Sequence, residues 1–302
     1  MSGGAVLQQA PAAWADYWRL TKPKVVALIV FTALAGMACA LALGAGSLGP
    51  VGLVAAPAGI GLAALGAAVA NCLLERHIDG RMRRTAGRAT ATGRIGFVPA
   101  AAFSLALLAA GLGLLQLYAN TLTTLLTLAT FVGYAFIYTL ALKPRTPQNI
   151  VVGGASGAMP PVLGWTAVTG SVDFQPLLLF LIIFVWTPPH FWALALCRIE
   201  DYAKAGIPML PVTHGERFTR LQILLYSWAL FAAALLPWAT GMAGGLYLAA
   251  AVVAGAVFCW LALQIWRTGA KKDCWALFSY SGPYLLLLFL ALIADAALAR
   301  LG

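Results

Sequence analysis

Residues 71–94 read NCLLERHIDGRMRRTAGRATATGR and lie between two long apolar runs. Asn71, Glu75 and Asp79 are spaced four residues apart, so a helix with 3.6 residues per turn places their side-chain oxygens along one face. Oxygen ligands of this kind suit a hard divalent cation. The segment also carries six arginines, whose guanidinium groups suit a phosphate or diphosphate. The sequence therefore predicts a metal site beside an anion site.

The composition of the rest of the chain is typical of an integral membrane protein. Of 302 residues, 62% are hydrophobic and 9% are charged, whereas soluble domains are roughly 25% charged. The net charge of +10 does not indicate nucleic acid, because the basic residues lie between apolar runs, where membrane topology accounts for them. Five cysteines without metal-type spacing are interpreted as small buried residues. No cleaved signal peptide is expected, because residues 1–20 have no basic region ahead of an apolar core.

Nine apolar runs of about 20 residues, the length that crosses a bilayer, predict an all-α membrane protein with nine transmembrane helices around a central cavity. We expect one polytopic domain over residues 1–302, and the expected spans are 25–45, 51–72, 97–118, 121–142, 148–169, 176–197, 219–240, 245–266 and 276–298. The fifth span contains several glycines and Pro160-Pro161, which predicts a broken helix.

Basic residues are distributed very unevenly between the two sides of this arrangement. Eighteen of the nineteen Lys and Arg residues fall on the side of the N-terminus, and Arg300 falls opposite. The positive-inside rule then places the N-terminus and the polar loops 73–95 and 198–218 in the cytoplasm and the C-terminus outside. This is the topology expected for a multi-pass protein of a bacterial inner (plasma) membrane, with the two loops forming the active site.

The 198–218 loop opens with a second mixture of acidic and basic residues. Asp201 is a candidate second-metal or water-positioning carboxylate, and Lys204 is a candidate phosphate contact. A salt-bridged loop without catalytic function is an equal alternative on residue type alone. The following GIPMLP, residues 206–211, is typical of a rigid segment that caps a cavity, because each proline fixes its backbone.

The sixth span contains the run WTPPHFW, residues 186–192. Its two prolines loosen the helix beside His190, which Trp186 and Phe191 flank. If the helix continues to Asp201, His190 lies about 16 Å deeper in the membrane. A planar macrocycle carrying iron would suit such a pocket, and a packed core histidine is an equal alternative.

Several of these stretches resemble a known family. NCLLERHID followed by RMRRTAGR is similar to the first signature of UbiA-type intramembrane prenyltransferases, a helix end that binds magnesium and a prenyl diphosphate. YWRLTKPKV, YTLALKPRTPQNIVVGG, WTPPHFWALA and DYAKAGIPMLPVTHG are similar, more narrowly, to its haem-farnesylating branch. Two positions depart from the family pattern. Ala89 replaces a common proline, and Glu200-Asp201 replaces the spaced aspartates of quinone-type members, which favours haem and weakens the case for a second metal.

The resemblance implies an enzyme that transfers the farnesyl group of farnesyl diphosphate to the 2-vinyl group of haem b, giving haem O and diphosphate for terminal oxidases. The implied cofactor is Mg²⁺, with the metal ligands Asn71, Glu75 and Asp79. The implied catalytic residues are Asn71, Asp79, Asp201 and Lys204. The implied diphosphate ligands are Arg83, Arg84, Arg88, Lys143, Arg145 and Arg198. The implied contacts of haem or the prenyl chain are His190, Trp186 and Tyr138.

The expected partners are farnesyl diphosphate, haem b and the lipid bilayer, with a haem A synthase as a candidate protein partner and no nucleic acid. Two other functions stay open. One is a UbiA-type prenyltransferase that acts on a quinone or other aromatic precursor. The other is a haem transporter, for which broken membrane helices are suitable, although a transporter does not need a metal-ligand row beside basic residues.

Overall fold

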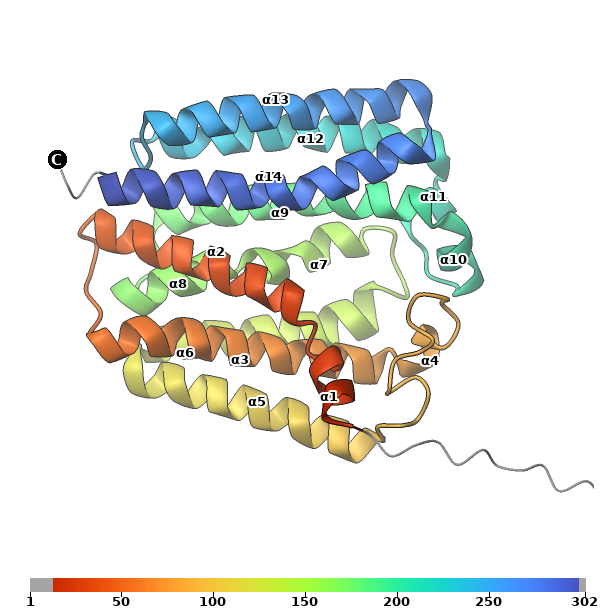
Figure 1. The fold of residues 1–302 in the computed structure, drawn as a ribbon, viewed down its shortest axis with the longest axis horizontal. Coiled ribbons are helices and arrows are strands. Elements are labelled where there is room, and N and C mark those ends of the chain that lie inside the picture. The colour runs from red at the N-terminus through yellow and green to blue at the C-terminus, as the bar shows by residue number, and fades with distance from the viewer. Residues whose placement is uncertain (1–12, 299–302) are drawn as a thin grey trace, which may run out of the picture.

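The computed structural model describes residues 13–298, and every regular element in that range is a helix (Figure 1). Eight of these helices are long and apolar enough to cross a membrane. They are α2 (Pro23–Ala42), α3 (Pro50–Leu74), α5 (Phe97–Tyr118), α6 with η1 (Thr121–Leu142), α9 (Phe174–Cys197), α12 (Gly215–Ala239), α13 (Gly245–Thr268) and α14 (Lys271–Leu298). The membrane helices predicted from the sequence are confirmed, with ends that differ by a few residues.

The fifth predicted span is a pair of short helices, α7 (Asn149–Ala158) and α8 (Pro160–Thr169). The helix breaks at Met159, because Pro160 and Pro161 have no N–H with which to continue the hydrogen bonding. Each half is too short to cross a bilayer alone. The predicted interruption of this span is therefore confirmed.

The helices α8 and α2 touch through their backbones. A Cβ atom placed on Gly164 of α8 would lie 1.9 Å from the carbonyl oxygen of Ala33, and one placed on Gly36 of α2 would lie 2.0 Å from that of Pro161. Only glycine fits at these two positions. Small residues allow such close approach between membrane helices, and here they fix the broken span against α2.

The second half of the fourth span is a π-helix, η1 (Gly133–Leu142), which follows α6 (Thr121–Val132). The N–H of Lys143 donates to the carbonyl of Tyr138, five residues earlier, at 2.9 Å. A π-helix is wider than an α-helix and is uncommon outside functional sites. This one ends beside α3, where Thr139 accepts a hydrogen bond from Asn71 and Lys143 donates one to Glu75.

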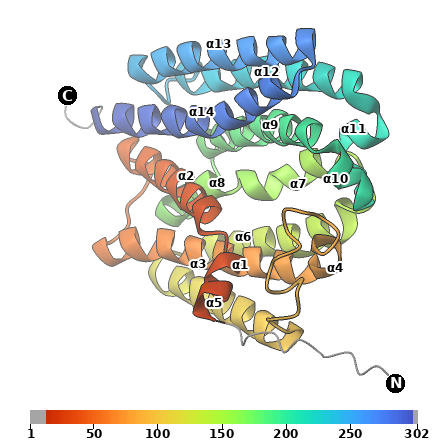
Figure 2. The ribbon, with the colours of Figure 1, turned by 45° about the vertical axis from the view of Figure 1, so that its right-hand side comes forward.

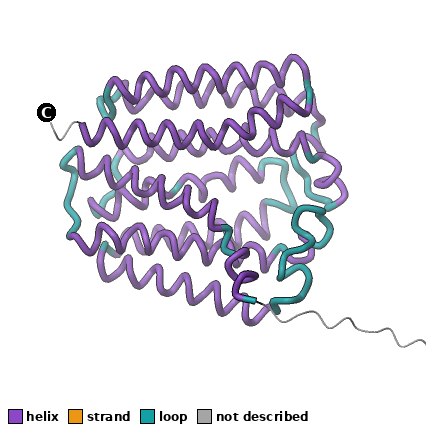
Figure 3. The backbone as a smooth tube through the Cα atoms, in the orientation of Figure 1, coloured by secondary structure: helices purple, strands orange, loops and turns teal. Residues whose placement is uncertain are grey.

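The short helices and the long connections gather at one end of the bundle (Figure 3). This end holds α1 (Trp14–Leu20), α4 (Arg76–Asp79), α10 (Ile199–Lys204) and α11 (Leu210–Thr213). Met82 of the first polar loop packs with Tyr202 and Ile207 of the second in one buried cluster. Both polar loops therefore lie at the same end of the bundle, and Figure 2 shows the α4 segment near α10.

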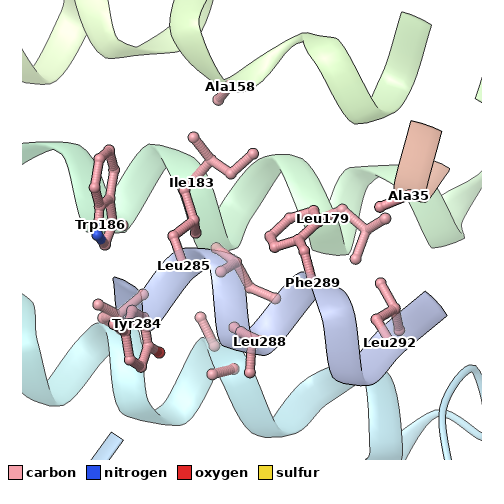
Figure 4. Packing of buried hydrophobic residues seen from close by; sticks show 14 of the residues in the cluster. Ala35, Ala158, Leu179, Ile183, Trp186, Tyr284, Leu285, Leu288, Phe289 and Leu292 are labelled. Carbon is pink, nitrogen blue, oxygen red and sulfur yellow. The ribbon is translucent and has the colours of Figure 1, made fainter. Parts of the chain in front are cut away.

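The largest buried cluster lies between α9, α14 and their neighbours. Ile183 and Leu179 of α9 lie beside Leu285 and Phe289 of α14 (Figure 4). Lipid tails are as apolar as these side chains, so close packing and buried hydrogen bonds hold the helices together in a bilayer. One such bond runs from Nε1 of Trp186 to the carbonyl of Ser281 at 2.9 Å.

Two details differ from the sequence-based predictions. The residues from Asn71 to Asp79 do not lie on one uninterrupted helix, because the backbone of Glu75 (φ −85°, ψ 1°) leaves the helical region and ends α3. The helix that carries His190 ends at Cys197, where the non-helical backbone of Arg198 (φ −132°, ψ 31°) separates it from α10. The condition of a continuous helix, on which the estimate of 16 Å between His190 and Asp201 depends, is therefore not met. Arg300 and residues 1–12 lie outside the described residues.

Candidate active site

Asn71 and Glu75 form the centre of a buried polar cluster, and each is only 3% exposed. The amide Nδ2 of Asn71 donates to Oε1 of Glu75 at 2.8 Å and to Oγ1 of Thr139 at 3.0 Å. The ammonium of Lys143 donates to the same Glu75 oxygen at 2.6 Å. The turn at Glu75 and the π-helix therefore bring together a carboxylate and a lysine that are far apart in the sequence.

Glu75 is ionised at neutral pH despite its burial. Burial alone would raise the pKa of Glu75, but the charge and hydrogen bond of Lys143, the charge of Lys22 and the Asn71 amide together lower it. A buried charge is tolerated only when it is paired and hydrogen-bonded in this way. The carboxylate is thus held in the form that a cation site requires.

Asp79 is the second buried carboxylate, at 2% exposure. Nη1 of Arg88 donates to its Oδ2 at 2.6 Å, and Oγ1 of Thr85 donates to its main-chain carbonyl at 3.1 Å. Burial lowers the pKa of Arg88, but the neighbouring Cys72, Asp79 and Glu75 outweigh it and the pKa rises. The predicted role of Arg88 beside the carboxylates therefore has a geometric basis.

Lys22 belongs to the same cluster, and sequence reasoning missed it. Its ammonium donates to Oδ1 of Asn71 at 2.7 Å. The sequence assigns Lys22 no ligand-binding role, yet it lies directly before Pro23. A residue before proline is disfavoured in the right-handed helical region, and Lys22 has left-handed backbone angles (φ 52°, ψ 56°). The pair KP at the start of a span was the signal that could have found it.

Tyr202 is a second residue that the sequence did not single out. It is 7% exposed and packs between the two polar loops. Burial raises the pKa of Tyr202, Arg84 and Arg198 lower it, and Glu75 and Asp201 raise it, with a net rise. Charged residues of both polar loops therefore act on the Tyr202 hydroxyl. Tyr202 lies where the two loops meet, next to the buried cluster of Asn71 and Glu75.

Arg198 and Asp201 pair with each other and not with the residues of the buried cluster. Their side chains pair at 3.6 Å, and the guanidinium carbon of Arg198 lies 5.5 Å from the ring centre of Trp275. Both residues line a cavity of about 400 Å³ that also contacts Glu216 and Lys271, and its lining does not include the three predicted metal ligands. The geometry agrees with the alternative of a salt-bridged loop, and catalytic roles for Arg198 and Asp201 stay predictions.

The other predicted anion-binding residues are exposed on the same end of the bundle. They are Arg83, Arg84, Arg145 and Lys204. An exposed basic side chain near a buried carboxylate site is available to a diphosphate, and it is equally typical of a cytoplasmic loop. Their roles stay predictions.

His190 is packed between aromatic rings of α9 and α14. Its ring centre lies 4.5 Å from that of Trp186 and 4.7 Å from that of Phe278, both in stacked geometry. Its Nδ1 lies 2.5 Å from Oγ of Ser281. Within residues 13–298, hydrogen bonds and ring contacts connect His190 to these two helices and not to Asn71.

Tyr138 lies on the π-helix, half-buried, and stacks on Tyr134 at 5.6 Å between ring centres. A Cβ atom on Gly153 of α7 would lie 2.2 Å from Cδ2 of Tyr138. The glycine therefore lets this ring lie against the broken span, close to Thr139 of the buried cluster. The predicted place of Tyr138 beside the site fits this arrangement.

The donor chemistry of the cluster fits a divalent cation. Among residues 13–298 no group of three His, Cys, Asp or Glu side chains is arranged to hold a metal. Glu75 and Asp79 nevertheless supply two carboxylates, and Asn71 supplies an amide oxygen that such a count leaves out. Oxygen donors of these two kinds are those that Mg²⁺ prefers.

Fold and site together define a membrane-embedded enzyme of one family. The family model described as UbiA prenyltransferase family matches residues 29–293. The chain belongs to the UbiA prenyltransferase family and is a prenyltransferase.

The similar proteins named protoheme IX farnesyltransferase span almost the whole chain. That of Methylibium petroleiphilum is 54% identical over 297 residues, covering 96% of this chain and 95% of the relative. That of Leptothrix cholodnii is 56% identical over 283 residues, covering 93% of this chain and 92% of the relative.

Solved structures share the fold at low sequence identity. A structure of digeranylgeranylglyceryl phosphate synthase has a TM-score of 0.75 at 17% identity, covering 93% of this chain and 98% of that one. A UbiA homologue from Archaeoglobus fulgidus, bound to GPP and Mg²⁺, has a TM-score of 0.59 at 16% identity, covering 92% of this chain and 99% of that one. The predicted all-α architecture is therefore confirmed.

Proposed function

We propose that this chain transfers the farnesyl group of farnesyl diphosphate to the 2-vinyl group of haem b, with water adding to the other vinyl carbon as a hydroxyl group, giving haem O and diphosphate. Relatives named protoheme IX farnesyltransferase that are more than half identical along the chain support this substrate pair. The observation that carries the reaction type is the buried cluster, in which Asn71, Glu75 and Asp79 each bond to a basic side chain at one end of the helical bundle.

Asn71, Glu75 and Asp79 would hold a divalent cation, Mg²⁺ in this proposal. Such a cation would supply positive charge to offset the negative charge of a departing diphosphate. The Mg²⁺ and prenyl diphosphate in the Archaeoglobus fulgidus homologue support this choice. Magnesium is thus proposed as the cofactor of the reaction.

Basic side chains of the chain also stabilise the negative charge on the departing diphosphate. Arg88 and Lys143 already lie at the carboxylates, with N–H groups 2.6 Å from Asp79 and Glu75. Fixed positive groups of this kind stabilise the transition state when they face an oxygen on which negative charge builds. The exposed Arg83, Arg84 and Arg145 extend the same positive surface, and Arg198 and Lys204 belong to the proposed set.

The prenyl cation left by the diphosphate needs protection from water until the vinyl carbon attacks. The apolar interior between the helices provides that protection. Tyr138 presents a ring face near the buried cluster, and an aromatic face stabilises an adjacent cation. Tyr138 is therefore proposed to contact the prenyl chain.

His190 is proposed to contact haem b through its second ring nitrogen. The hydroxyl of Ser281 donates to the carbonyl of Phe278 at 2.6 Å, so its single proton is in use. Nδ1 of His190 then donates to Ser281, and Nε2 keeps its lone pair, as iron ligation requires. If His190→Ala binds and converts haem b as the parent does, the histidine has only a packing role.

The same proposal covers location and partners. The protein is a single polytopic domain in a bacterial inner membrane, with cytoplasmic polar loops and N-terminus, and a haem A synthase is its candidate protein partner. The clustering of both polar loops at one end supports this topology. Labelling of engineered cysteines from each side of the membrane tests it, and labelling of the loops from the outside overturns it.

Pigment analysis tests the reaction directly. The chain is expressed in a bacterium that lacks its own haem O, and extracted haems are separated and identified by mass. The proposal requires haem O with the parent chain and none with Asp79→Asn at equal membrane levels. Equal amounts of haem O from parent and Asp79→Asn would overturn the metal assignment, and no haem O from either would overturn the substrate assignment.

A further inference from the structure

The orientation of the Asn71 amide follows from its neighbours. The ammonium of Lys22 can only donate a hydrogen bond, and the ionised carboxylate of Glu75 can only accept one. The carbonyl Oδ1 of Asn71 therefore faces Lys22 at 2.7 Å, and the Nδ2 group faces Glu75 at 2.8 Å. Reversing the amide would set donor against donor and acceptor against acceptor.

This orientation presents the wrong end of the amide to a cation at Glu75. An amide N–H group cannot ligate a metal, whereas the amide oxygen can. A cation shared by Asn71 and Glu75 therefore requires the amide to turn, and this breaks the bond to Lys22. Thr139 accepts from the same Nδ2 at 3.0 Å and holds the amide in its present position.

The backbone at Lys22 indicates that this contact is specific. Lys22 is the single non-glycine residue with positive φ within residues 13–298. Left-handed angles are uncommon in such a residue and cost about 1 kcal/mol or more. They direct the ammonium to Asn71, whereas Lys24, two residues later, is exposed and bonds to none of the cluster residues.

The net charge of the cluster also opposes binding of a metal ion without its diphosphate. Two carboxylates, on Glu75 and Asp79, lie with the cations of Lys22, Lys143 and Arg88. The cluster thus carries one net positive charge, which opposes the entry of a lone divalent cation. A diphosphate anion reverses this balance, so the metal is favoured only together with the diphosphate.

We propose that Lys22 is a positioning residue that competes with the divalent cation for the Asn71 carbonyl and keeps metal affinity low until a diphosphate enters. This inference deepens the proposed function and rests on its metal site. On diphosphate binding, the Asn71 amide turns toward the metal and the Lys22 ammonium is released. The Lys22–Asn71 contact thus lets the metal bind together with the diphosphate and weakens binding of the metal alone.

Binding of Mn²⁺ to the purified full chain in lipid nanodiscs tests this inference, with free Mn²⁺ measured by electron paramagnetic resonance. Without diphosphate, Lys22→Met should bind Mn²⁺ at least about tenfold more tightly than the parent, since neighbours of metal ligands typically change affinity by this much. Inorganic diphosphate should tighten the parent more than it tightens Lys22→Met. A damaged fold weakens binding, so tightening cannot come from misfolding.

Matched variants separate the contact from general charge effects. Lys24→Met removes a basic charge two residues away and should change Mn²⁺ affinity by less than about twofold. In the Asn71→Ala background, Lys22→Met should tighten Mn²⁺ binding less than it does in the parent, because the shared partner is gone and only the charge effect of Lys22 is left. Lys22→Ala repeats the test if Lys22→Met does not fold.

The outcomes are distinct. Unchanged or weaker Mn²⁺ binding by both Lys22 variants, with normal binding by the parent, overturns the role of Lys22 and leaves the metal site standing. Equal tightening by Lys24→Met also overturns it. No Mn²⁺ binding by the parent, even with inorganic diphosphate, overturns the metal site and this inference together.

Discussion

Replacing Lys143 by methionine isolates the buried ion pair at the centre of the site. The side chains of Lys143 and Glu75 are 16% and 4% exposed, and their charged atoms lie 2.6 Å apart. Removing one partner of a buried pair leaves an uncompensated charge and costs about 3–5 kcal/mol. Because Asn71 still donates to Glu75, we expect the lower figure, about 3 kcal/mol, and a fall in apparent melting temperature of roughly 5–10 °C.

The stability that Lys143→Met loses should depend on pH. The pKa of Glu75 is lowered in the folded protein, with burial opposed chiefly by Lys143, so its ionised form stabilises the parent until the pH falls through that lowered pKa. Without Lys143, burial is opposed less and the pKa of Glu75 rises relative to the parent. The folded variant then takes up a proton that the parent does not, and the stability difference shrinks as the pH falls from about 7 to 5.

Thermal unfolding in detergent, followed by tryptophan fluorescence at both pH values, measures this. The double variant Lys143→Met with Glu75→Gln removes both charges and should recover to within about 1 kcal/mol of the parent. The exposed Arg145→Met serves as control and should stay within about 0.5 kcal/mol. A deficit that is equal at pH 5 and pH 7, or a double variant no more stable than Lys143→Met, would refute the pairing.

Three further outcomes are expected. Arg88→Met removes a charge-assisted bond and should raise KM for farnesyl diphosphate about tenfold or more while leaving KM for haem b unchanged in steady-state assays. Gly164→Ala should destabilise the protein by about 1–3 kcal/mol in thermal unfolding, because a Cβ there meets backbone, whereas Gly157→Ala, with open space around it, should not. Ser281→Ala removes the hydrogen bond that orients His190 and should weaken haem b binding about tenfold in spectrophotometric titration; unchanged haem affinity would count against that histidine.

The sequence predicted the membrane helices well because each signal was local. Apolar runs of bilayer length, the prolines at the start of α8 and the glycines of the fifth span each act within a few residues. The four-residue spacing of Asn71, Glu75 and Asp79 likewise survived the turn that ends α3, because the hydrogen bonds from residue 75 to residue 71 and from residue 79 to residue 75 persist across it. These features need no knowledge of the tertiary structure.

The partners of the predicted metal ligands could not be predicted in the same way. Lys22 reaches Asn71 across 49 residues, and Lys143 reaches Glu75 across 68. These contacts depend on how α2 and the π-helix pack against α3, which no local pattern encodes. The π-helix could not be predicted, because its sequence GYAFIYTLAL is an ordinary apolar run. The sequence gives Arg88 and Arg198 the same expected role as diphosphate ligands, whereas in the fold Arg88 pairs with Asp79 and Arg198 pairs with Asp201.

Farnesyl transfer to haem is tested most directly by a competition experiment with the purified chain. The protein in nanodiscs receives farnesyl diphosphate, Mg²⁺ and equal amounts of haem b and 4-hydroxybenzoate, and the products are identified by mass spectrometry. We predict haem O as the product, dependent on added Mg²⁺ and lost in Asp79→Asn. Farnesylated 4-hydroxybenzoate without haem O would contradict the proposed function.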